Sequence, residues 1–310
     1  MKLLLTGGLG HIGSYFLKKI YKIKKIKELY VIDNFLTNRY SSLFNLQNRG
    51  VKIFFLEKDL SKKDSLNNFP RVDFVINLAS ITDAENSFKI KKIIYKNNLG
   101  IFRNIINYCK KNCSKLIHIS STSVYGDQIN NIVDESCKTL KPQSPYAKIK
   151  IQEENMLKNQ NKINYTTYRF GTIAGVSNGM RFHTAINKFC LNAVIKKPIP
   201  IWKGMLNKER PFLSLNEAFR VIKFTIERNF FNNQIYNIVS QNLELNKIIK
   251  FLKKNIKNIK INFVDSKLVN YSSYKISCQK FNSKAFKLNA KIFKDITTTL
   301  KIFKNINNAL

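Results

Sequence analysis

Residues 6–13 read TGGLGHIG and directly follow the apolar run KLLLT at residues 2–6. Gly7, Gly10 and Gly13 have the spacing G-x-x-G-x-x-G, and an amphipathic helical pattern begins among them. Glycines at these positions permit a tight turn and a close backbone approach, so that a pyrophosphate can rest on the N-terminus of the helix. A glycine-rich turn between a strand and a helix therefore predicts a dinucleotide-binding fold.

Short apolar runs alternate with amphipathic segments through the first half of the chain. The early runs are continuously apolar, as in strands of a parallel sheet that is buried on both faces. The predicted strands are Lys2–Thr6, Leu29–Ile32, Lys52–Leu56, Phe74–Leu78, Leu116–Ile119 and Tyr165–Tyr168. Strands that alternate with helices in this way indicate the α/β class and a Rossmann-type doubly wound parallel sheet.

The pattern of the sequence changes near residue 170. Glycine and asparagine become frequent between residues 171 and 179, and Pro198 and Pro200 interrupt the segment that follows. A chain of 310 residues corresponds to about two average domains. We therefore expect a Rossmann domain at residues 1–170 with a returning segment at about 206–240, and a smaller, mixed substrate-binding domain at 171–205 and 241–310.

The formal net charge of +35 admits a surface that binds polyanions. Arginine supplies only nine of the 54 basic residues, although sites that read bases or phosphates favour the arginine fork. The lysines are spread along the whole chain and form no single block. This distribution favours a compositional bias over a nucleic-acid surface, and we expect no nucleic-acid partner.

The composition also bears on disulfides, metals and membranes. Five cysteines are an odd number, so a disulfide scaffold is not expected. Three histidines leave too few ligands for a zinc site, and we expect no metal. No run approaches 18 apolar residues, and the apolar start is too short for a signal peptide. We therefore expect a soluble, cytoplasmic protein without a membrane partner.

The second predicted strand ends in Asp33 and Asn34, about 20 residues after the last glycine of the turn. A carboxylate there can accept hydrogen bonds from both ribose hydroxyls and repels a 2′-phosphate, which favours NAD over NADP. Arg39 follows shortly afterwards and could hold a 2′-phosphate instead. Asp33 could also be an ordinary turn residue at the end of a strand.

Tyr146 and Lys150 are four residues apart in a segment that reads SPYAKIK. Ser144 is suited to cap a helix and Pro145 to open it, so the Tyr and Lys side chains are expected one turn apart on the same face. An ammonium beside a phenol favours the ionised phenol, which can then act as a base near neutral pH. Ser121 follows the preceding strand and could hold a substrate oxygen against Tyr146. A Tyr-x-x-x-Lys pair taken singly is usually a solvated helix face.

Together these motifs resemble the extended short-chain dehydrogenases, and among them the NAD-dependent epimerase/dehydratase family, which acts on nucleotide sugars. The resemblance is strongest over residues 1–215. It rests on motifs that stand in the family's order: the glycine turn, Asp33-Asn34, Asp59-Leu60, Asn77-Leu78-Ala79-Ser80, Ser121 to Gly126 and Tyr146-x-x-x-Lys150. It implies an NAD-dependent enzyme that binds a nucleotide-diphosphate sugar.

The resemblance also assigns roles to individual residues. Ser121 takes the catalytic hydroxyl position, Tyr146 that of the base, and Lys150 that of the residue that holds the nicotinamide ribose. The implied cofactor-binding residues are Gly7, Gly10, His11, Ile12, Gly13, Asp33, Asn34, Asn38, Asp59, Leu60, Leu78, Ala79, Ser80, Asn97, Tyr146, Lys150 and Phe170. The candidate substrate-binding residues are Thr82, Ser121, Thr122, Thr172, Arg181, His183, Trp202 and Arg210.

Several candidate substrate residues have alternative interpretations. Thr172 stands where many family members have an Asn that contacts the substrate diphosphate. Because arginine is scarce in this chain, Arg181 and Arg210 are candidates for a diphosphate clamp, although either could form a surface ion pair. His183 could be structural, and Trp202 could belong to the core.

A homodimer is implied by the same resemblance. In relatives, the helices near residues 88–111 and 145–160 form the contact between subunits. Several apolar residues there could contribute or could face the core instead, namely Tyr95, Phe102, Ile149 and Met156.

The residues before Gly126 bear on the reaction. In the family that this chain resembles, the sugar 4,6-dehydratases carry an acid three residues before this glycine. The chain has Ser123 at that position and Thr122 before it. Without a carboxylate, elimination of water is poorly supported, and so is decarboxylation. The leading hypothesis is a UDP-hexose 4-epimerase that oxidises C4 transiently and returns the hydride to the opposite face. The alternatives are an NAD(P)-dependent reductase or dehydratase of a nucleotide sugar, and a non-catalytic protein that senses the cofactor or binds polyanions.

Overall fold

Seven parallel strands form one sheet in the computed structural model, which describes residues 1–47, 49–83, 86–128, 132–265, 274–284 and 286–303. Their spatial order is β3-β2-β1-β4-β5-β7-β11. The strands are β1 (Lys2–Thr6), β2 (Glu28–Asp33), β3 (Lys52–Glu57), β4 (Phe74–Asn77), β5 (Lys115–Ser121), β7 (Tyr165–Phe170) and β11 (Gln234–Ile238). The order reverses between β1 and β4, and doubly wound sheets bind nucleotides at such a reversal.

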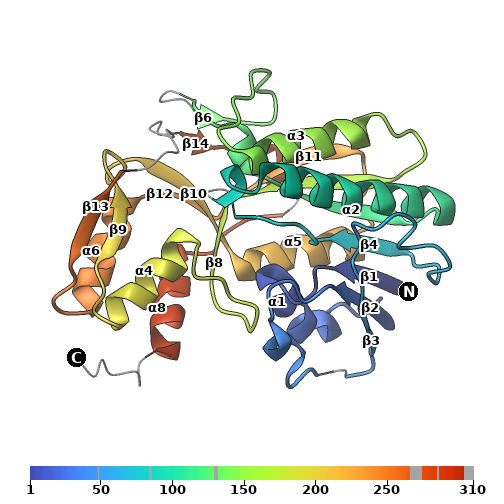
Figure 1. Cartoon of the computed structure of the whole chain (residues 1–310), viewed down its shortest axis with the longest axis horizontal. Helices are drawn as coiled ribbons and strands as arrows, with labels where there is room; N and C mark the ends of the chain where they lie inside the picture. The colour runs from blue at the N-terminus through green and yellow to red at the C-terminus, as the bar shows by residue number, and fades with distance from the viewer. Residues whose placement is uncertain (48, 84–85, 129–131, 266–273, 285, 304–310) are drawn as a thin grey trace.

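Helices cover both faces of this sheet (Figure 1). Two of them, α1 and α5, pack on one face, and α2 and α3 lie side by side on the other. They are α1 (His11–Lys19), α5 (Leu215–Glu227), α2 (Lys91–Asn112) and α3 (Pro145–Lys158). Within β1, Leu3 and Leu5 join the apolar core with α1 and α5, whereas Leu4 joins the core with α2 and α3. Burial on both faces explains the uninterrupted apolar runs and confirms the predicted fold class.

Three short sheets lie outside the large one, with the strand orders β12-β10-β8, β13-β9 and β14-β6. Their strands are β6 (Ile132–Val133), β8 (Thr172–Ala174), β9 (Ile199–Trp202), β10 (Glu209–Ser214), β12 (Gln241–Glu244), β13 (Ile261–Val264) and β14 (Lys275–Ile276). The pair β14-β6 lies beside α3, and the other two sheets belong to the smaller part of the chain (Figure 1). Three helices pack around an apolar core that includes Ile186, Phe189, Ile248 and Ile296. They are α4 (Ala185–Val194), α6 (Leu245–Asn255) and α8 (Ile292–Ile302).

Short helical segments complete the described elements. They are η1 (Ile20–Lys22), η2 (Tyr40–Leu43), η3 (Asn86–Phe88), η4 (Thr122–Val124) and α7 (Gln279–Asn282). No helix in the ranges given above is both long and apolar enough to cross a lipid bilayer.

The six strands predicted from the sequence are all present, and their ends differ from the prediction by at most two residues. The segment at about 206–240, which the sequence predicts to return to the Rossmann domain, contributes to both parts of the chain. Strand β11 pairs with β7 in the large sheet and α5 packs against that sheet, whereas β10 pairs with β8 and β12 in a short sheet. The domain boundaries themselves stay a prediction.

Asp295 of α8 is a partly buried carboxylate near α5. Its Oδ2 has no hydrogen-bond partner within the described part of the chain, and Glu217 of α5 is close enough to repel it. Burial raises the pKa of Asp295 from 3.8 to about 6. The folded chain therefore binds this proton more tightly than the unfolded chain, so the free energy of unfolding falls as the pH rises from about 4 to about 6.

We expect Asp295→Asn to raise the free energy of unfolding at pH 7 by about 2 kcal/mol and to change it little near pH 4. An uncharged amide removes the cost of burying the carboxylate, and that cost exists only where the carboxyl group is ionised. Urea unfolding at both pH values measures the effect. The control is Asp265→Asn, at a carboxylate that is 83% exposed in its ion pair with Lys203, and it should change either value by less than about 1 kcal/mol. An equal gain at both pH values would contradict the explanation.

Candidate active site

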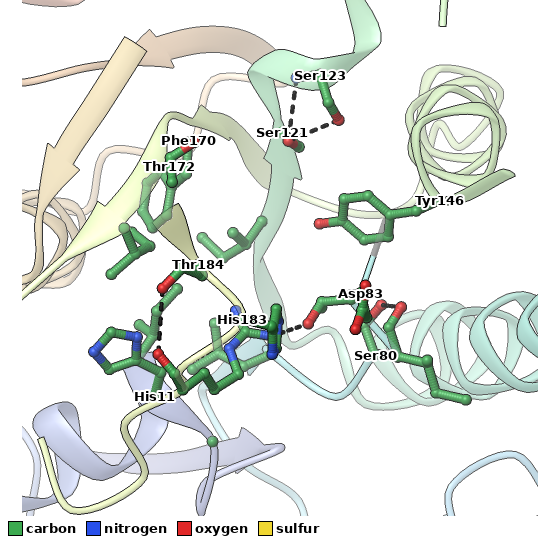
Figure 2. Close-up of a pocket in the computed structure, with 18 of the residues that line it drawn as sticks. His11, Ser80, Asp83, Ser121, Ser123, Tyr146, Phe170, Thr172, His183 and Thr184 are labelled. Atoms are coloured by element: carbon green, nitrogen blue, oxygen red, sulfur yellow. Dashed lines mark hydrogen bonds between the residues drawn. The ribbon is translucent and has the colours of Figure 1, made fainter. Parts of the chain in front are cut away.

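A cavity of about 1050 Å³ opens at the carboxyl ends of the central strands and extends to the smaller part of the chain (Figure 2). Its walls contain every predicted site residue except Asn38 and Asp59. Residues from both parts of the chain therefore meet in one space, as a cofactor and its substrate require.

The glycine turn has the geometry that a pyrophosphate needs. Gly7 has a φ of +64°, and a Cβ there would lie 2.6 Å from the backbone nitrogen of Ala79. A Cβ at Gly13 would lie 2.5 Å from the carbonyl oxygen of Gly8. Helix α1 begins at His11 without a side-chain cap, so the N–H groups of its first turn can bind an anion. These features fit NAD.

The carboxylate of Asp33 connects the end of β2 to the glycine turn. It accepts hydrogen bonds from the N–H of Leu9 at 3.0 Å and from the N–H of Phe35 at 3.1 Å while it lines the cavity. A carboxylate fixed at this place fits the ribose hydroxyls of NAD. Arg39 also lines the cavity; burial lowers the pKa of its guanidinium, and the charge of Asp33 opposes that shift. The neighbouring carboxylate offsets the charge with which Arg39 could hold a 2′-phosphate.

The loop after β4 forms another wall of the cofactor half. Asn98 of α2 accepts a hydrogen bond from the N–H of Ile81 at 2.9 Å and donates one to its carbonyl oxygen at 3.0 Å. Thr6 of β1 donates to the side-chain oxygen of Asn77 at 2.7 Å. Sequence reasoning selected Asn97, which lines the cavity, and missed Asn98. No sequence signal separates the buried asparagine from its neighbour in this helix.

Two predicted cofactor residues lie outside the cavity walls. The carboxylate of Asp59 accepts hydrogen bonds from the N–H and the hydroxyl of Ser61, at 2.9 and 2.7 Å, and so shapes a turn. Its neighbour Leu60 lines the cavity. Asn38 adopts a φ of +50° and donates its N–H to the carbonyl oxygen of Phe35. In this structure Asp59 and Asn38 support the backbone around the cofactor site.

Helix α3 begins as the sequence predicts. The Ser144 hydroxyl accepts a hydrogen bond from the N–H of Ala147 at 3.2 Å, and Pro145 is the first helical residue. Tyr146 and Lys150 therefore lie one turn apart, with the Lys150 Nζ 5.7 Å from the centre of the Tyr146 ring. The pair lines the cavity, as a Tyr-Lys pair that acts on substrate and cofactor must.

Ser121 and Tyr146 border the same open space (Figure 2). The Ser121 oxygen accepts hydrogen bonds from the N–H of Ser123 at 3.2 Å and from the Ser123 hydroxyl at 2.9 Å. A hydroxyl that accepts twice still has its own proton to donate, so Ser121 can hold a substrate oxygen. The Thr122 hydroxyl instead donates to the carbonyl oxygen of Phe170 at 3.4 Å.

Basic side chains gather in the substrate half of the cavity. Arg181 donates to the Thr82 hydroxyl, and its Nε is buried with no partner in the described ranges. Burial lowers the pKa of Arg181 and that of His183, which keeps the imidazole neutral near pH 7. The Arg210 guanidinium lies 5.8 Å from the centre of the Tyr274 ring. Such guanidinium groups can bind an anionic ligand.

Sequence reasoning missed Tyr274 and Lys188 among the cavity residues. It offered Trp202 either as a site aromatic or as a core residue, and this side chain both lines the cavity and packs against the smaller apolar core. Tyr274 belongs to a part of the sequence without a recognisable motif, and Lys188 is one of many lysines. Helix α4, which carries Lys188, packs on α8 and β9, and Tyr274 belongs to an apolar cluster with Tyr125 and Val239, so contacts between distant segments bring both side chains to the cavity.

Residues 175–179, which we call the clasp, connect the loop after β8 to the glycine turn, and Figure 1 shows this loop reaching α1. The His11 Nε2–H donates to the carbonyl oxygen of Gly175 at 2.8 Å, and burial lowers the pKa of His11 to about 4. The Ser177 hydroxyl donates to the carbonyl oxygen of His11 at 2.9 Å. The N–H of Gly179 donates to the Ser14 hydroxyl at 2.9 Å. The hydrogen bonds of the clasp to His11 and Ser14 therefore stabilise the conformation of the glycine turn and the start of α1.

We expect Gly179→Ala to weaken NAD binding about tenfold, because a Cβ there would lie 2.2 Å from the carbonyl oxygen of Leu9 and would displace hydrogen bonds of about 1 kcal/mol each. Isothermal titration with NAD measures the change in affinity. Gly50→Ala is the control: a Cβ there meets no atom within 4 Å, and Gly50 lies outside the cavity walls. Its φ of +86° makes the alanine cost some stability, but NAD affinity should not change. Unchanged affinity in the Gly179 variant would mean that the clasp does not support the turn.

Comparisons with known proteins agree with this geometry. A model of the NAD-dependent epimerase/dehydratase family matches residues 3–239. A Methanocaldococcus jannaschii protein that is provisionally named a UDP-glucose 4-epimerase is 26% identical over 262 residues, which is 82% of this chain and 82% of that protein.

Solved structures share the whole fold. A UDP-glucuronic acid 4-epimerase from Bacillus cereus, solved with NAD and a fluorinated UDP-glucuronic acid, has a TM-score of 0.87 and 23% identity over 98% of this chain and 99% of its own. A dTDP-glucose 4,6-dehydratase from Streptomyces venezuelae, solved with NAD, has a TM-score of 0.84 and 18% identity over 98% of this chain and 97% of its own. Likeness at this level of identity shows the fold, and the two enzymes have different reactions.

Proposed function

The chain belongs to the NAD-dependent epimerase/dehydratase family, and on that premise we propose that it is a nucleotide-sugar epimerase, most simply a UDP-hexose 4-epimerase. The reaction oxidises the sugar transiently at C4 and returns the hydride to the opposite face. NAD, when bound, accepts and returns that hydride.

Three side chains perform the proton chemistry in this proposal. Tyr146 takes the proton of the sugar hydroxyl that is oxidised and returns it when the ketone is reduced. Ser121 donates a hydrogen bond to the same oxygen, for which its bonds with Ser123 leave its proton available. Lys150, whose Nζ lies 5.7 Å from the centre of the Tyr146 ring, holds the nicotinamide ribose. Arg181 and Arg210 bind the diphosphate of the substrate.

The observation that carries the choice of epimerisation is the pair of hydroxyls at positions 122 and 123. The Thr122 hydroxyl donates a hydrogen bond to the carbonyl oxygen of Phe170, and the Ser123 hydroxyl donates one to the Ser121 hydroxyl. A hydroxyl without a base beside it does not remove a proton from carbon, which elimination of water requires. Asp83, on the loop after β4, faces the positive charge of Arg181. These contacts support oxidation and hydride return without elimination.

The proposal is tested by incubating the pure protein with NAD and a panel of nucleotide sugars and by analysing the products by mass. A new isomer of unchanged mass without net NADH supports the epimerase and identifies its substrate. A product that appears only with reduced cofactor indicates the reductase, and a product that has lost water indicates the dehydratase. In the last case the argument from Thr122 and Ser123 would be wrong.

We also propose a homodimer through α2 and α3. Phe102 and Ile149, which the sequence offered as contact residues, are buried in the chain's own core and cannot contribute. Tyr95 and Met156 are partly exposed, and Ile93 of α2 is 60% exposed. These side chains support a contact at this helix pair, and sedimentation velocity tests it.

A further inference from the structure

Glu153 lies on α3 beside the residues to which the proposed reaction gives a role. Its Oε2 accepts hydrogen bonds from the Lys150 Nζ at 2.7 Å and from the His118 Nε2 at 3.0 Å. The side chains of all three residues are at most 5% exposed. A carboxylate in such a place costs several kcal/mol to bury unless it is paired, so its presence beside Lys150 calls for a role.

The charge states of the three groups follow from their surroundings. Burial lowers the pKa of His118, so its imidazole is neutral and donates its Nε2–H, while its Nδ1 lies 3.3 Å from the Thr167 hydroxyl. Burial also disfavours the charged forms of Lys150 and Glu153, but their mutual attraction outweighs it. The pKa of Lys150 is therefore raised and that of Glu153 lowered. The two side chains form a buried ion pair with His118 as a second donor.

We propose that Glu153 is a positioning residue of the reaction, which holds the Lys150 ammonium in place. The inference rests on the proposed role of Lys150 in holding the nicotinamide ribose. The ammonium has three N–H groups; one donates to Glu153 at 2.7 Å, so two are left for the ribose hydroxyls of the cofactor. The buried carboxylate fixes the direction in which those two N–H groups point.

The groups around this ion pair have partners of their own. Glu154, the next residue on α3, forms an ion pair with Arg169, in which Nη2 of Arg169 lies 2.6 Å from Oε2 of Glu154. From α2, the apolar ring of Phe102 packs on His118 at 4.7 Å between ring centres. In the part of the chain that the structure describes, five charged or titratable groups face Tyr146 and Lys150. They are Glu153 and Glu154 from α3, His118 from β5, Arg169 from β7 through Glu154, and Arg181 from the segment before α4. Removal of the Glu153 carboxylate therefore takes away the hydrogen-bonded partner of the Lys150 ammonium.

The test is a double-variant cycle on NAD affinity, measured by isothermal titration. Glu153→Gln is expected to weaken NAD binding about tenfold, because the Lys150 Nζ loses the charged acceptor that holds it at 2.7 Å. Glu153→Asp keeps the charge and should restore part of the affinity. In a Lys150→Met background Glu153 has no ammonium to hold, so Glu153→Gln should then leave the NAD affinity unchanged, whereas a merely structural role would weaken it in both backgrounds. The readout needs no turnover, so it is independent of which sugar is the substrate.

An NAD affinity that stays unchanged in Glu153→Gln while the melting temperature falls would overturn the proposal and leave Glu153 a structural residue. The matched control is Glu154→Gln, which removes the adjacent buried carboxylate and should lower the melting temperature with a smaller effect on NAD affinity. If Glu153→Gln alone does not fold, Lys150→Met with Glu153→Gln should restore folding, since removal of a whole buried pair is tolerated better than removal of one partner. Failure of that double variant to fold would also overturn the proposal.

Discussion

Tyr146→Phe is expected to lower kcat by about 10³-fold or more while NAD stays bound. The change removes one hydroxyl in the first turn of α3 and leaves the ring, whose centre lies 5.7 Å from the Lys150 Nζ. The hydroxyl is the proposed proton carrier for the sugar oxygen, and Ser121 can hold that oxygen but has no base beside it in its bonds with Ser123. The measurement is the rate of isomer formation at saturating substrate, together with the NAD content of the protein.

The control is Tyr168→Phe, a second change of Tyr to Phe, on strand β7. The Tyr168 hydroxyl is buried and bonded to the Thr225 hydroxyl at 2.5 Å, away from the cavity. Tyr168→Phe is expected to lower the free energy of unfolding by about 1 kcal/mol and to leave kcat unchanged. Near-normal turnover in Tyr146→Phe would contradict the mechanism, whereas loss of NAD from that variant would make Tyr146 a binding residue.

The sequence predicted the strands, the glycine turn and the start of α3 because local patterns mark them. Continuous apolar runs mark strands that are buried on both faces, so the six predicted strands are found. The glycine turn is recognised by its local spacing, although the close approach that Gly7 permits is to the distant residue Ala79. The start of α3 follows from Ser144 and Pro145, which act within their own turn.

The features that the sequence did not predict depend on partners from distant elements. No pattern in the sequence singles out Glu153 and Glu154, and both are buried because His118 of β5 and Arg169 of β7 bind them. The clasp makes hydrogen bonds with residues more than 130 positions away. A charged or polar side chain is buried only where its partner is supplied, and pattern arguments carry no information on that partner.

Arg169→Met is expected to lower the free energy of unfolding by about 3–5 kcal/mol. The Arg169 guanidinium makes a two-pronged contact with Glu154, with Nε 2.9 Å from one carboxylate oxygen and Nη2 2.6 Å from the other. Both side chains are at most 5% exposed, and Ser120 adds a third bond to Glu154 at 2.6 Å. Loss of the arginine leaves a buried carboxylate without its cation, on the helix that carries Tyr146. Urea unfolding of the variant measures the cost.

The double variant Arg169→Met with Glu154→Gln separates the cost of an unpaired charge from that of lost packing. It removes both charges, so it should regain most of the lost stability, and the difference between the single and the double variant measures the unpaired carboxylate. Lys203→Met breaks an ion pair in which Lys203 and Asp265 are 61% and 83% exposed, and it should change the free energy of unfolding by less than about 1 kcal/mol. If the double variant is as unstable as Arg169→Met alone, the arginine contributes through packing, including its contact with the Tyr125 ring at 4.9 Å, and not through its charge.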